Sequence, residues 1–466
     1  MKNQYDVIVV GGGGAGMSAA LLASETRARV LLIDAADRLG GSTAQSGGVF
    51  YAAGTSVQRA MGIEDSPANA YRQYMLLNQY KVEPILARKL LDDSAAALEW
   101  LMELGVSFRG EHLYDSGIDG VARGHRAAEG GAEIGAMLGA AISRKPIDVA
   151  LRTRARKLIC DAAGRVRGIN ADGVDVRAGA VVLASGGFGA NPEMLTRYYP
   201  EAAAHNDWAW YIGIKECRGD AIDMARDVGA DIVGYNRGLL NLAAGFTRQV
   251  EPYFPGWVMC VNRDGRRFMN ETLAYVVASE VVRVQLGSEC FGLLDEDSRL
   301  AAKSPPSTPL NRWGSTWETE RLAQYAKERR VYQADTIDEL AESAGIHAPA
   351  LKTTLERYNA DCAAGEDSAF SKAKDLLRPI RTPPFYAARM RACQIALTSC
   401  GPKIDPDAQV LRRDDLPIPG LYAAGEVSGG VLGDRYVGGG NSICNAIVFG
   451  RIAGRNAAAF ALKNNG

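Results

Sequence analysis

The sequence predicts an α/β protein whose main domain contains a parallel sheet and is interrupted by an inserted α+β domain. Three observations predict this. A strand–helix–strand pattern fills the first 34 residues, and a similar strand-and-glycine pattern returns at Gly420. Between about 240 and 392, aromatic residues and charged helical segments dominate instead. With 466 residues the chain is long enough for two or three domains. We therefore assign 1–239 and 393–466 to the main domain and 240–392 to an inserted cap.

The N-terminal elements form the clearest part of the pattern. Residues 5–10 are a β-branched run typical of a buried parallel strand. Residues 15–27 are predicted to be a helix, and 29–33 a second strand that ends at Asp34. This is a βαβ unit. Further helices are predicted at 84–104, 219–229, 318–330, 336–345 and 442–460, and a further buried strand begins at Ala180.

Composition excludes several classes of function. Lys and Arg total 53 against 54 Asp and Glu, so no electrostatic footprint for nucleic acid or an anionic membrane is predicted. The eight cysteines form no C-x-x-C pair, and no metal site is predicted. No apolar stretch is long enough to span a bilayer, and no signal peptide is evident. We expect a soluble, cytoplasmic protein without membrane insertion.

The glycine motif Gly11-x-Gly13-x-x-Gly16 lies between the predicted strand and helix. Gly11 would permit a tight turn, Gly13 would let the backbone approach a pyrophosphate, and Gly16 would allow close packing of helix on strand. The helix N-terminus then offers N–H groups to the pyrophosphate. Asp34 stands where an acid can accept hydrogen bonds from ribose hydroxyls, and it disfavours a 2′-phosphate. A dinucleotide site is predicted.

Four further segments resemble, in order, those of the FAD-dependent fumarate reductase/succinate dehydrogenase flavoprotein superfamily. They are Asp34-x-x-x-Arg38-x-Gly40-Gly41-Ser42-Thr43-x-x-Ser46-Gly47-Gly48, Ala184-Ser-Gly-Gly-Phe188, Gly420-Leu-Tyr-Ala-Ala-Gly-Glu426 and Phe449-Gly-Arg-Ile-Ala-Gly454. With the N-terminal motif they span nearly the whole chain. The resemblance implies a Rossmann-type FAD-binding domain, an inserted cap that carries catalytic residues, and FAD as the cofactor.

The resemblance also implies a set of cofactor-binding residues. Ser42 stands where relatives with covalently bound flavin carry a histidine, so non-covalent FAD is expected. Glu426 is expected to bind a ribityl or ribose hydroxyl. In relatives the N-terminus of the last helix points at the flavin pyrimidine edge, where its dipole would stabilise negative charge. The expected residues are Gly11, Gly13, Gly14, Ala15, Gly16, Asp34, Gly41, Ser42, Thr43, Ser46, Gly47, Gly48, Ser185, Gly186, Gly187, Glu426, Asn441, Ser442 and Ile443.

The inserted segment Gly265-Arg-Arg-Phe-Met-Asn-Glu271 resembles the cap motif of the superfamily. In fumarate reductases a proton-donating arginine follows this motif, and here Tyr275 takes that position. Fumarate reductases also carry a histidine before T-x-G-G, and here Leu397 takes that position. These two departures argue against reduction of a dicarboxylate. For Tyr275 the alternative is a buried core tyrosine.

A second glycine loop resembles the active-site loop of 3-ketosteroid Δ1-dehydrogenases. Tyr436-Val-Gly-Gly-Gly440 is similar to their Y-x-G-x-G, in which the tyrosine hydroxyl and the last glycine N–H hold a carbonyl oxygen. Gly438 stands where Δ4-dehydrogenases have a serine, which weakens a Δ4 assignment. Arg435 matches the carboxylate-binding arginine of fumarate reductases; the alternative is a structural ion-pair partner. No role is predicted for Tyr114 or His125.

The active-site pattern is closest to 3-ketosteroid dehydrogenases and cyclic-ketone desaturases. We therefore expect an enzyme, an FAD-dependent dehydrogenase acting on CH–CH groups. Its substrate would be a ketone or enone: a 3-ketosteroid, or a smaller cyclic ketone or keto-acid. Tyr275 would remove the α-proton, and the β-hydride would pass to flavin N5. The direction, the electron partner and the oligomeric state stay open.

Two alternative functions stay open. The first is a fumarate-reductase-like reductase of an α,β-unsaturated carboxylate, which Arg435 supports. The second is an electron-carrier flavoprotein without substrate chemistry of its own, which a cap of about 150 residues makes improbable because a carrier needs no closed pocket.

Overall fold

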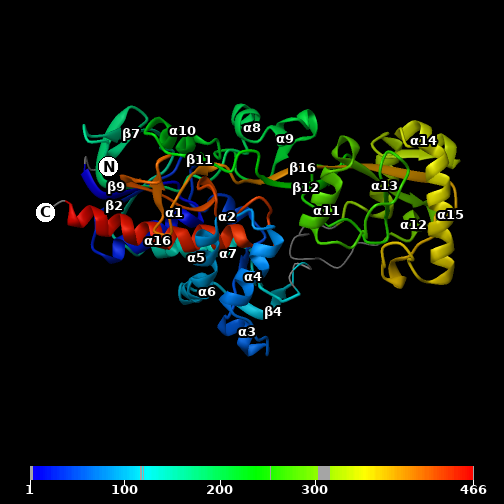
Figure 1. The fold of residues 1–466 in the computed structure, drawn as a ribbon, viewed down its shortest axis with the longest axis horizontal. Helices are drawn as coiled ribbons and strands as arrows, with labels where there is room; N and C mark the ends of the chain where they lie inside the picture. Colours follow the sequence, from blue (N-terminus) through cyan, green and yellow to red (C-terminus); the bar gives the residue numbers. More distant parts are fainter. Residues whose placement is uncertain (1–3, 116–117, 119, 252, 303–314, 465–466) are drawn as a thin grey trace. The chain divides into compact units, whose positions relative to one another are not determined.

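The computed structural model describes residues 4–115, 118, 120–251, 253–302 and 315–464 (Figure 1). Two compact units are present. The first unit consists of Met1–Ala204, Gly213–Leu239 and Ile395–Gly466, and the second of His205–Ile212 and Leu240–Gln394. Residues 252 and 303–314 of the predicted cap lie outside the described residues.

A parallel sheet forms the centre of the first unit. Its strands are buried on both faces, as their β-branched sequences predict: all residues of β1 after Gln4 are buried. The strands follow the order β18–β19–β9–β1–β2–β6, and β19, β9, β1, β2 and β6 are parallel neighbours. The bounds are β1 (Gln4–Val10), β2 (Val30–Ile33), β6 (Ile147–Ala150), β9 (Val174–Leu183), β18 (Gln409–Leu411) and β19 (Pro417–Ala423). The predicted α/β fold is confirmed.

Two helices from opposite ends of the chain pack closely in this unit. They are α1 (Gly14–Glu25) and α16 (Asn441–Lys463) (Figure 1). A Cβ on Gly450 would lie 2.5 Å from the carbonyl oxygen of Ala15, and one on Gly454 would lie 2.1 Å from that of Ala19. Glycine is therefore required wherever the backbone of α16 crosses α1.

Smaller elements complete the first unit. An antiparallel extension of β7 (Ala155–Cys160) and β8 (Val166–Ala171) continues from β9, and a separate sheet has the order β3–β5–β4. That sheet consists of β3 (Val49–Tyr51), β4 (Phe108–Tyr114) and β5 (Gly124–Ala127), and the helices include α2 (Gly41–Gln45), α3 (Ser56–Ala60), α4 (Pro67–Leu77), α7 (Gly131–Ser143), α8 (Pro192–Tyr198), α9 (Pro200–Ala203) and α10 (Asp220–Asp227).

The single helix predicted at 84–104 is instead two helices, α5 (Pro84–Asp92) and α6 (Ser94–Glu103). The break falls at Asp93, whose N–H still bonds to the carbonyl of Lys89. The hydroxyl of Ser94 donates to the carbonyl of Leu91 and accepts from the N–H of Ala53. This tertiary hydrogen bond fixes the junction, which the apolar spacing cannot indicate.

No described helix has the length and apolar character that a bilayer crossing requires.

The second unit is an α+β body around an antiparallel sheet. Its strand order is β10–β16–β14–β13, with β12 and β15 also pairing with β16. Two buried apolar clusters pack against this sheet, one around Trp317 and one around Phe291. The bounds are β10 (Trp210–Tyr211), β12 (Gly238–Ala244), β13 (Met259–Val261), β14 (Glu289–Asp295), β15 (Tyr332–Ala334), β16 (Phe385–Thr398), α11 (Tyr275–Arg283), α12 (Glu296–Leu300), α13 (Thr319–Lys327), α14 (Ile337–Ala344) and α15 (Ala348–Ala364). The first two residues of β12 and the last four of β16 belong to the first unit.

The unit boundaries differ from the predicted domains at residues 205–212 and, by two residues, at Cys393 and Gln394, which cluster with the second unit. Residues 205–212, which we placed in the FAD-binding domain, cluster with the second unit. The cause is local packing: β10 pairs with β16, and Arg389 and Arg391 stack over the ring of Trp208. Neither composition nor hydrophobic pattern marks so short a segment as part of another unit.

Candidate active site

The first glycine motif has the backbone geometry that its predicted roles require. Gly11 has φ 109°, which side chains rarely adopt. A Cβ on Gly16 would lie 1.7 Å from the carbonyl oxygen of Gly11, so helix α1 packs directly on the turn. A Cβ on Gly13 would meet nothing closer than 4.0 Å, which leaves space in front of the helix N-terminus. The turn therefore presents open backbone and the positive end of a helix dipole.

Asp34 closes β2 beside this turn and is buried. One carboxylate oxygen accepts from the N–H of Gly12 at 2.5 Å, and the other accepts from the N–H of Ala36 at 2.6 Å. These bonds fix the carboxylate, and each oxygen keeps a lone pair that a ribose hydroxyl could use.

The second glycine segment lies against the first. Gly13 bridges to Gly40, and a Cβ on Gly41 would lie 3.0 Å from the Cα of Gly13. The hydroxyl of Thr43 accepts from the N–H of Gly14 at 3.3 Å. Two segments about 30 residues apart thus form one cradle of backbone.

Ser42 projects from this cradle. Its hydroxyl accepts from the N–H of Ile214 at 3.3 Å and lies 3.7 Å from the sulfur of Cys217.

Glu426 lies in the η4 turn (Gly425–Val427), which follows β19. One of its oxygens accepts from the N–H and the hydroxyl of Thr398, at 2.9 and 3.2 Å. A Cβ on Gly187 would lie 2.4 Å from the same oxygen, so only glycine allows this approach. Burial raises the pKa of Glu426, and hydrogen bonds from Thr398 and Gly187 oppose that rise. The arrangement can present a fixed acceptor to a ligand hydroxyl.

The N-terminus of α16 is surrounded by tyrosines. The hydroxyl of Tyr436 lies 3.3 Å from that of Ser442. The amide of Asn441, which is fully buried, donates to the hydroxyl of Tyr74 at 3.3 Å. A Cβ on Gly440 would lie 2.0 Å from the carbonyl oxygen of Val49, which fixes the start of the helix against β3. Burial raises the pKa of Tyr436, although hydrogen bonds to Ser442 oppose this.

Arg435 projects from a loop whose backbone is held in place. Its N–H donates to the side-chain oxygen of Asn78 at 3.2 Å. The neighbouring Asp434 is paired with Arg237 at 2.6 Å and receives no bond from Arg435. Among the residues that the structure describes, the guanidinium of Arg435 forms no hydrogen bond or ion pair, and the residue is half-buried. The ion-pair alternative for Arg435 therefore lacks a described partner.

The predicted cofactor residues all belong to the first unit. Those before residue 50 lie in the turn before α1, the first residues of α1, the end of β2, helix α2 and the turn before β3. The others lie in the turn after β9, the η4 turn (Gly425–Val427) and the first turn of α16. This set fits FAD. It offers open backbone at Gly13 and a side-chain oxygen of Asn441 that is buried without a hydrogen-bond partner. A buried orphan acceptor of this kind calls for a donor from a ligand or water.

Tyr275 is the first residue of α11 in the second unit, and it is buried. Its ring lies edge to face against that of Tyr253, with centroids 5.4 Å apart. Tyr436 belongs to the first unit, so the meeting of the two phenols at the flavin remains a prediction. Leu397, at the position of the fumarate reductase histidine, is buried in β16 next to Thr398.

The cap motif forms a buried ion cluster. Arg267 pairs with Glu271 at 2.7 Å and with Asp367 at 2.8 Å, and Lys372 pairs with Glu271 at 2.9 Å. Burial opposes ionisation of Asp367, but the bonds from Arg267 prevail and hold the pKa of that carboxyl below its usual range. Because two cations balance two anions, the cluster is structural.

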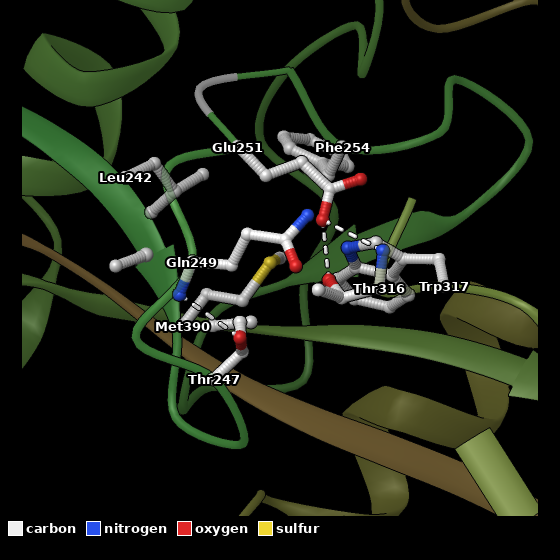
Figure 2. Close-up of a pocket in the computed structure, with 10 residues that line it drawn as sticks. Leu242, Thr247, Gln249, Glu251, Phe254, Thr316, Trp317 and Met390 are labelled. Carbon is white, nitrogen blue, oxygen red and sulfur yellow. Dashed lines mark hydrogen bonds between the residues drawn. The ribbon is translucent and has the colours of Figure 1, made fainter. Parts of the chain in front are cut away.

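A small cavity in the second unit is shown in Figure 2. Its carboxylate, Glu251, already accepts from the N–H of Thr316 at 3.0 Å and from the hydroxyl of Ser315 at 2.7 Å. The cavity has room for about one water molecule. It does not provide a substrate pocket.

His125, for which no role was predicted, is structural. It is buried, its Nδ1 donates to the carbonyl of Arg123 at 2.8 Å, and its Nε2 accepts from the hydroxyl of Thr55 at 2.8 Å. Burial is the main cause that lowers the pKa of His125, to about 4. The imidazole is therefore neutral.

Four residues that hold the candidate site were not predicted from the sequence. Thr398 fixes Glu426, Tyr74 fixes Asn441, and Asn78 fixes the Arg435 loop, while Tyr51 lies under the glycine loop, 2.9 Å from a Cβ on Gly439. The Asn78–Arg435 and Tyr74–Asn441 contacts span more than 350 residues. No local pattern marks such contacts.

Comparison with known proteins places this architecture in a family. The model of the FAD binding domain family matches residues 6–443. The chain is 31% identical to a cytochrome-type fumarate reductase of Shewanella frigidimarina, covering 98% of this chain and 78% of the relative. It is also 31% identical to a urocanate reductase of Eggerthella lenta, covering 99% and 76%. A solved 3-ketosteroid Δ4-(5α)-dehydrogenase of Rhodococcus jostii is 27% identical, with a TM-score of 0.79 and coverage of 98% and 97%. The chain therefore belongs to the FAD binding domain family and is an FAD-dependent oxidoreductase.

Proposed function

We propose that the protein reduces the carbon–carbon double bond of an α,β-unsaturated carboxylate. The relatives at 31% identity over nearly the whole chain are named for fumarate and urocanate. Both compounds carry a double bond conjugated to a carboxylate. This was the alternative in the sequence analysis, and these relatives favour it over desaturation of a ketone.

One observation carries the proposal: Arg435 has no described protein partner, although its backbone is fixed. A half-buried guanidinium beside a cofactor site suits a carboxylate, which it binds through two parallel hydrogen bonds. Asp434 is the nearest acid in sequence, and it is already occupied by Arg237. The positive charge therefore stays available for a substrate.

The remaining roles follow from the chemistry. When bound in its reduced form, FAD would supply the hydride. Arg435 binds the carboxylate and orients the double bond. Because burial raises the pKa of Tyr436, its hydroxyl is protonated at neutral pH and can donate a hydrogen bond. Tyr275, at the position of the proton-donating arginine of fumarate reductases, is the proposed proton donor to the α-carbon.

We further propose a monocarboxylate substrate. Leu397 provides a buried apolar surface where fumarate reductases carry a histidine. Without that histidine, a second carboxylate would lose a charged partner, and leaving it unpaired would cost several kcal/mol. The end of the substrate away from Arg435 is therefore neutral.

Desaturation of a ketone remains a second candidate. It is favoured by Tyr436 and Tyr275, since two phenols suit a ketone better than a dicarboxylate. The likeness to the 3-ketosteroid dehydrogenase of Rhodococcus jostii supports it too.

Anaerobic titration of the FAD-loaded enzyme separates these functions. The enzyme is reduced with dithionite and mixed with acrylate, urocanate, fumarate or 2-cyclohexenone, and reoxidation of the flavin is followed by absorbance. We expect the monocarboxylates to reoxidise the flavin fastest. Reoxidation by cyclohexenone alone, with no response to any carboxylate, would contradict the proposal and favour the ketone reaction.

A further inference from the structure

A buried carboxylate in the second unit is surrounded by three arginines. Glu289, at the start of β14, is fully buried. Arg389 contacts one oxygen through Nε at 2.8 Å and Nη2 at 2.6 Å. Arg391 contacts the same oxygen through its Nε and Nη2, each at 2.8 Å. Arg263 bonds to the other oxygen. The three guanidinium groups are thereby held in fixed orientations.

The cluster carries more positive charge than its carboxylate needs. Burial alone would raise the pKa of Glu289, but hydrogen bonds from Arg391, Arg263 and Arg389 outweigh it and lower that pKa. Glu289 is therefore ionised, and one negative charge faces three positive ones. Arg389 and Arg391 are two residues apart on β16 and thus share a face of the strand, where like charges repel. One arginine would be enough to neutralise Glu289. The burial of Glu289 therefore does not account for the positive charges of the other two arginines.

The excess charge is accessible. The side chains of Arg263, Arg389 and Arg391 are 41%, 26% and 19% exposed. Over the described part of the chain, the Nη1 groups of Arg389 and Arg391 have no hydrogen-bond partner. Both arginines also stack on Trp208, at 5.5 and 4.8 Å from the ring centre.

The positive field reaches the neighbouring His205. Burial lowers the pKa of His205, and the charge of Arg391 lowers it further.

We propose that this arginine cluster binds a phosphate group with two negative charges, either free or carried by an organic ligand. A phosphate monoester brings close to two charges at neutral pH, which matches the excess. Its oxygens can accept hydrogen bonds from the N–H groups of the two free Nη1 atoms. Because Glu289 and Trp208 already orient the arginines, little side-chain entropy is lost on binding. The proposal uses only the second unit and does not depend on the proposed reaction.

The test is calorimetric titration of the FAD-saturated enzyme, at low ionic strength, with inorganic phosphate and with ADP. We expect saturable binding at one site per chain. The double variant Arg389→Gln/Arg391→Gln should bind at least about tenfold more weakly, because both positive charges and both free Nη1 groups are lost. ADP binding much more tightly than phosphate would show that the site takes a nucleotide-borne phosphate, and equal affinities would show that it recognises phosphate alone.

Arg330→Gln is the matched control. Arg330 is also in the second unit, pairs with Glu328 at 3.1 Å and stacks on Tyr325 at 5.0 Å, but it adds no excess charge around a buried carboxylate. This variant should bind like the wild type.

Conservative variants cover the case in which the double variant fails to fold. Arg389→Lys and Arg391→Lys keep the charge that Glu289 needs but lose the fork, so each should fold and bind several-fold more weakly. Wild-type affinity in both lysine variants would overturn the proposal. So would heat changes that equal those of potassium chloride at the same ionic strength.

Discussion

The two units of the chain hold their polar groups in opposite ways. In the first unit the proposed cofactor cradle is made of backbone, and its key residues, Gly11 and Gly16, are glycines whose missing side chains leave room, as does Gly187 beside Glu426. In the second unit the cap motif is fixed by charged side chains, with Arg267 joined to an acid 100 residues away. The cradle keeps its shape because its glycines have no side chains, whereas the cap motif is held by paired opposite charges.

This difference predicts different responses to substitution. A single methyl group should disable the cradle, because backbone cannot move aside. The cap should tolerate added volume better but should lose stability when one charge of a buried group is removed.

The largest effect is expected for Gly16→Ala. The new Cβ would lie 1.7 Å from the carbonyl oxygen of Gly11, so α1 would have to separate from β1. We expect the purified protein to lose bound FAD, measured as the ratio of flavin absorbance to protein absorbance.

Gly139→Ala is the control, since a Cβ there meets nothing within 4 Å in the middle of α7. It should keep FAD and gain up to about 1 kcal/mol of stability. Full retention of FAD by Gly16→Ala would show that the cradle is less rigid than described.

The next effect concerns the cap cluster. Arg267→Met leaves Asp367 without its cation and Glu271 with Lys372 alone. Breaking such a buried group should lower the free energy of unfolding by about 3–5 kcal/mol, measured by urea denaturation.

Arg330→Met, which removes an exposed pair, should cost less than about 1 kcal/mol. Equal losses in the two variants would refute the contrast between a buried and an exposed pair.

The difference between the two units also explains which site residues could be predicted from the sequence. The cradle was predicted because its residues are neighbours in the chain: Gly11, Gly13 and Gly16 form one turn, and Asp34 ends the next strand. Glu426 was predicted from a local motif, but Thr398, which fixes it, was not, because nothing near Thr398 points to β19. Asp367 and Lys372 were missed in the same way. Contacts between distant segments leave no periodic signal.

A third prediction uses His125. Burial lowers its pKa to about 4 in the folded protein, against about 6.5 in the unfolded chain. The unfolded state therefore binds more protons between these values. The free energy of unfolding should fall by up to about 3 kcal/mol as the pH drops from 6.5 to 4.

His125→Gln should remove this part of the pH dependence, measured by denaturation at several pH values. An unchanged slope between pH 6.5 and 4 would show that other groups cause it.

The most direct test of the proposed function compares Arg435→Gln with the wild type on a charged substrate and its neutral isostere. The reduced, FAD-loaded enzymes are reoxidised anaerobically with acrylate and with acrylamide. If Arg435 binds a carboxylate, the variant should lose about 100-fold in kcat/KM on acrylate, equivalent to about 2.7 kcal/mol, and change little on acrylamide. Equal losses on both substrates, or none on acrylate, would contradict the assignment of Arg435 as the carboxylate-binding residue.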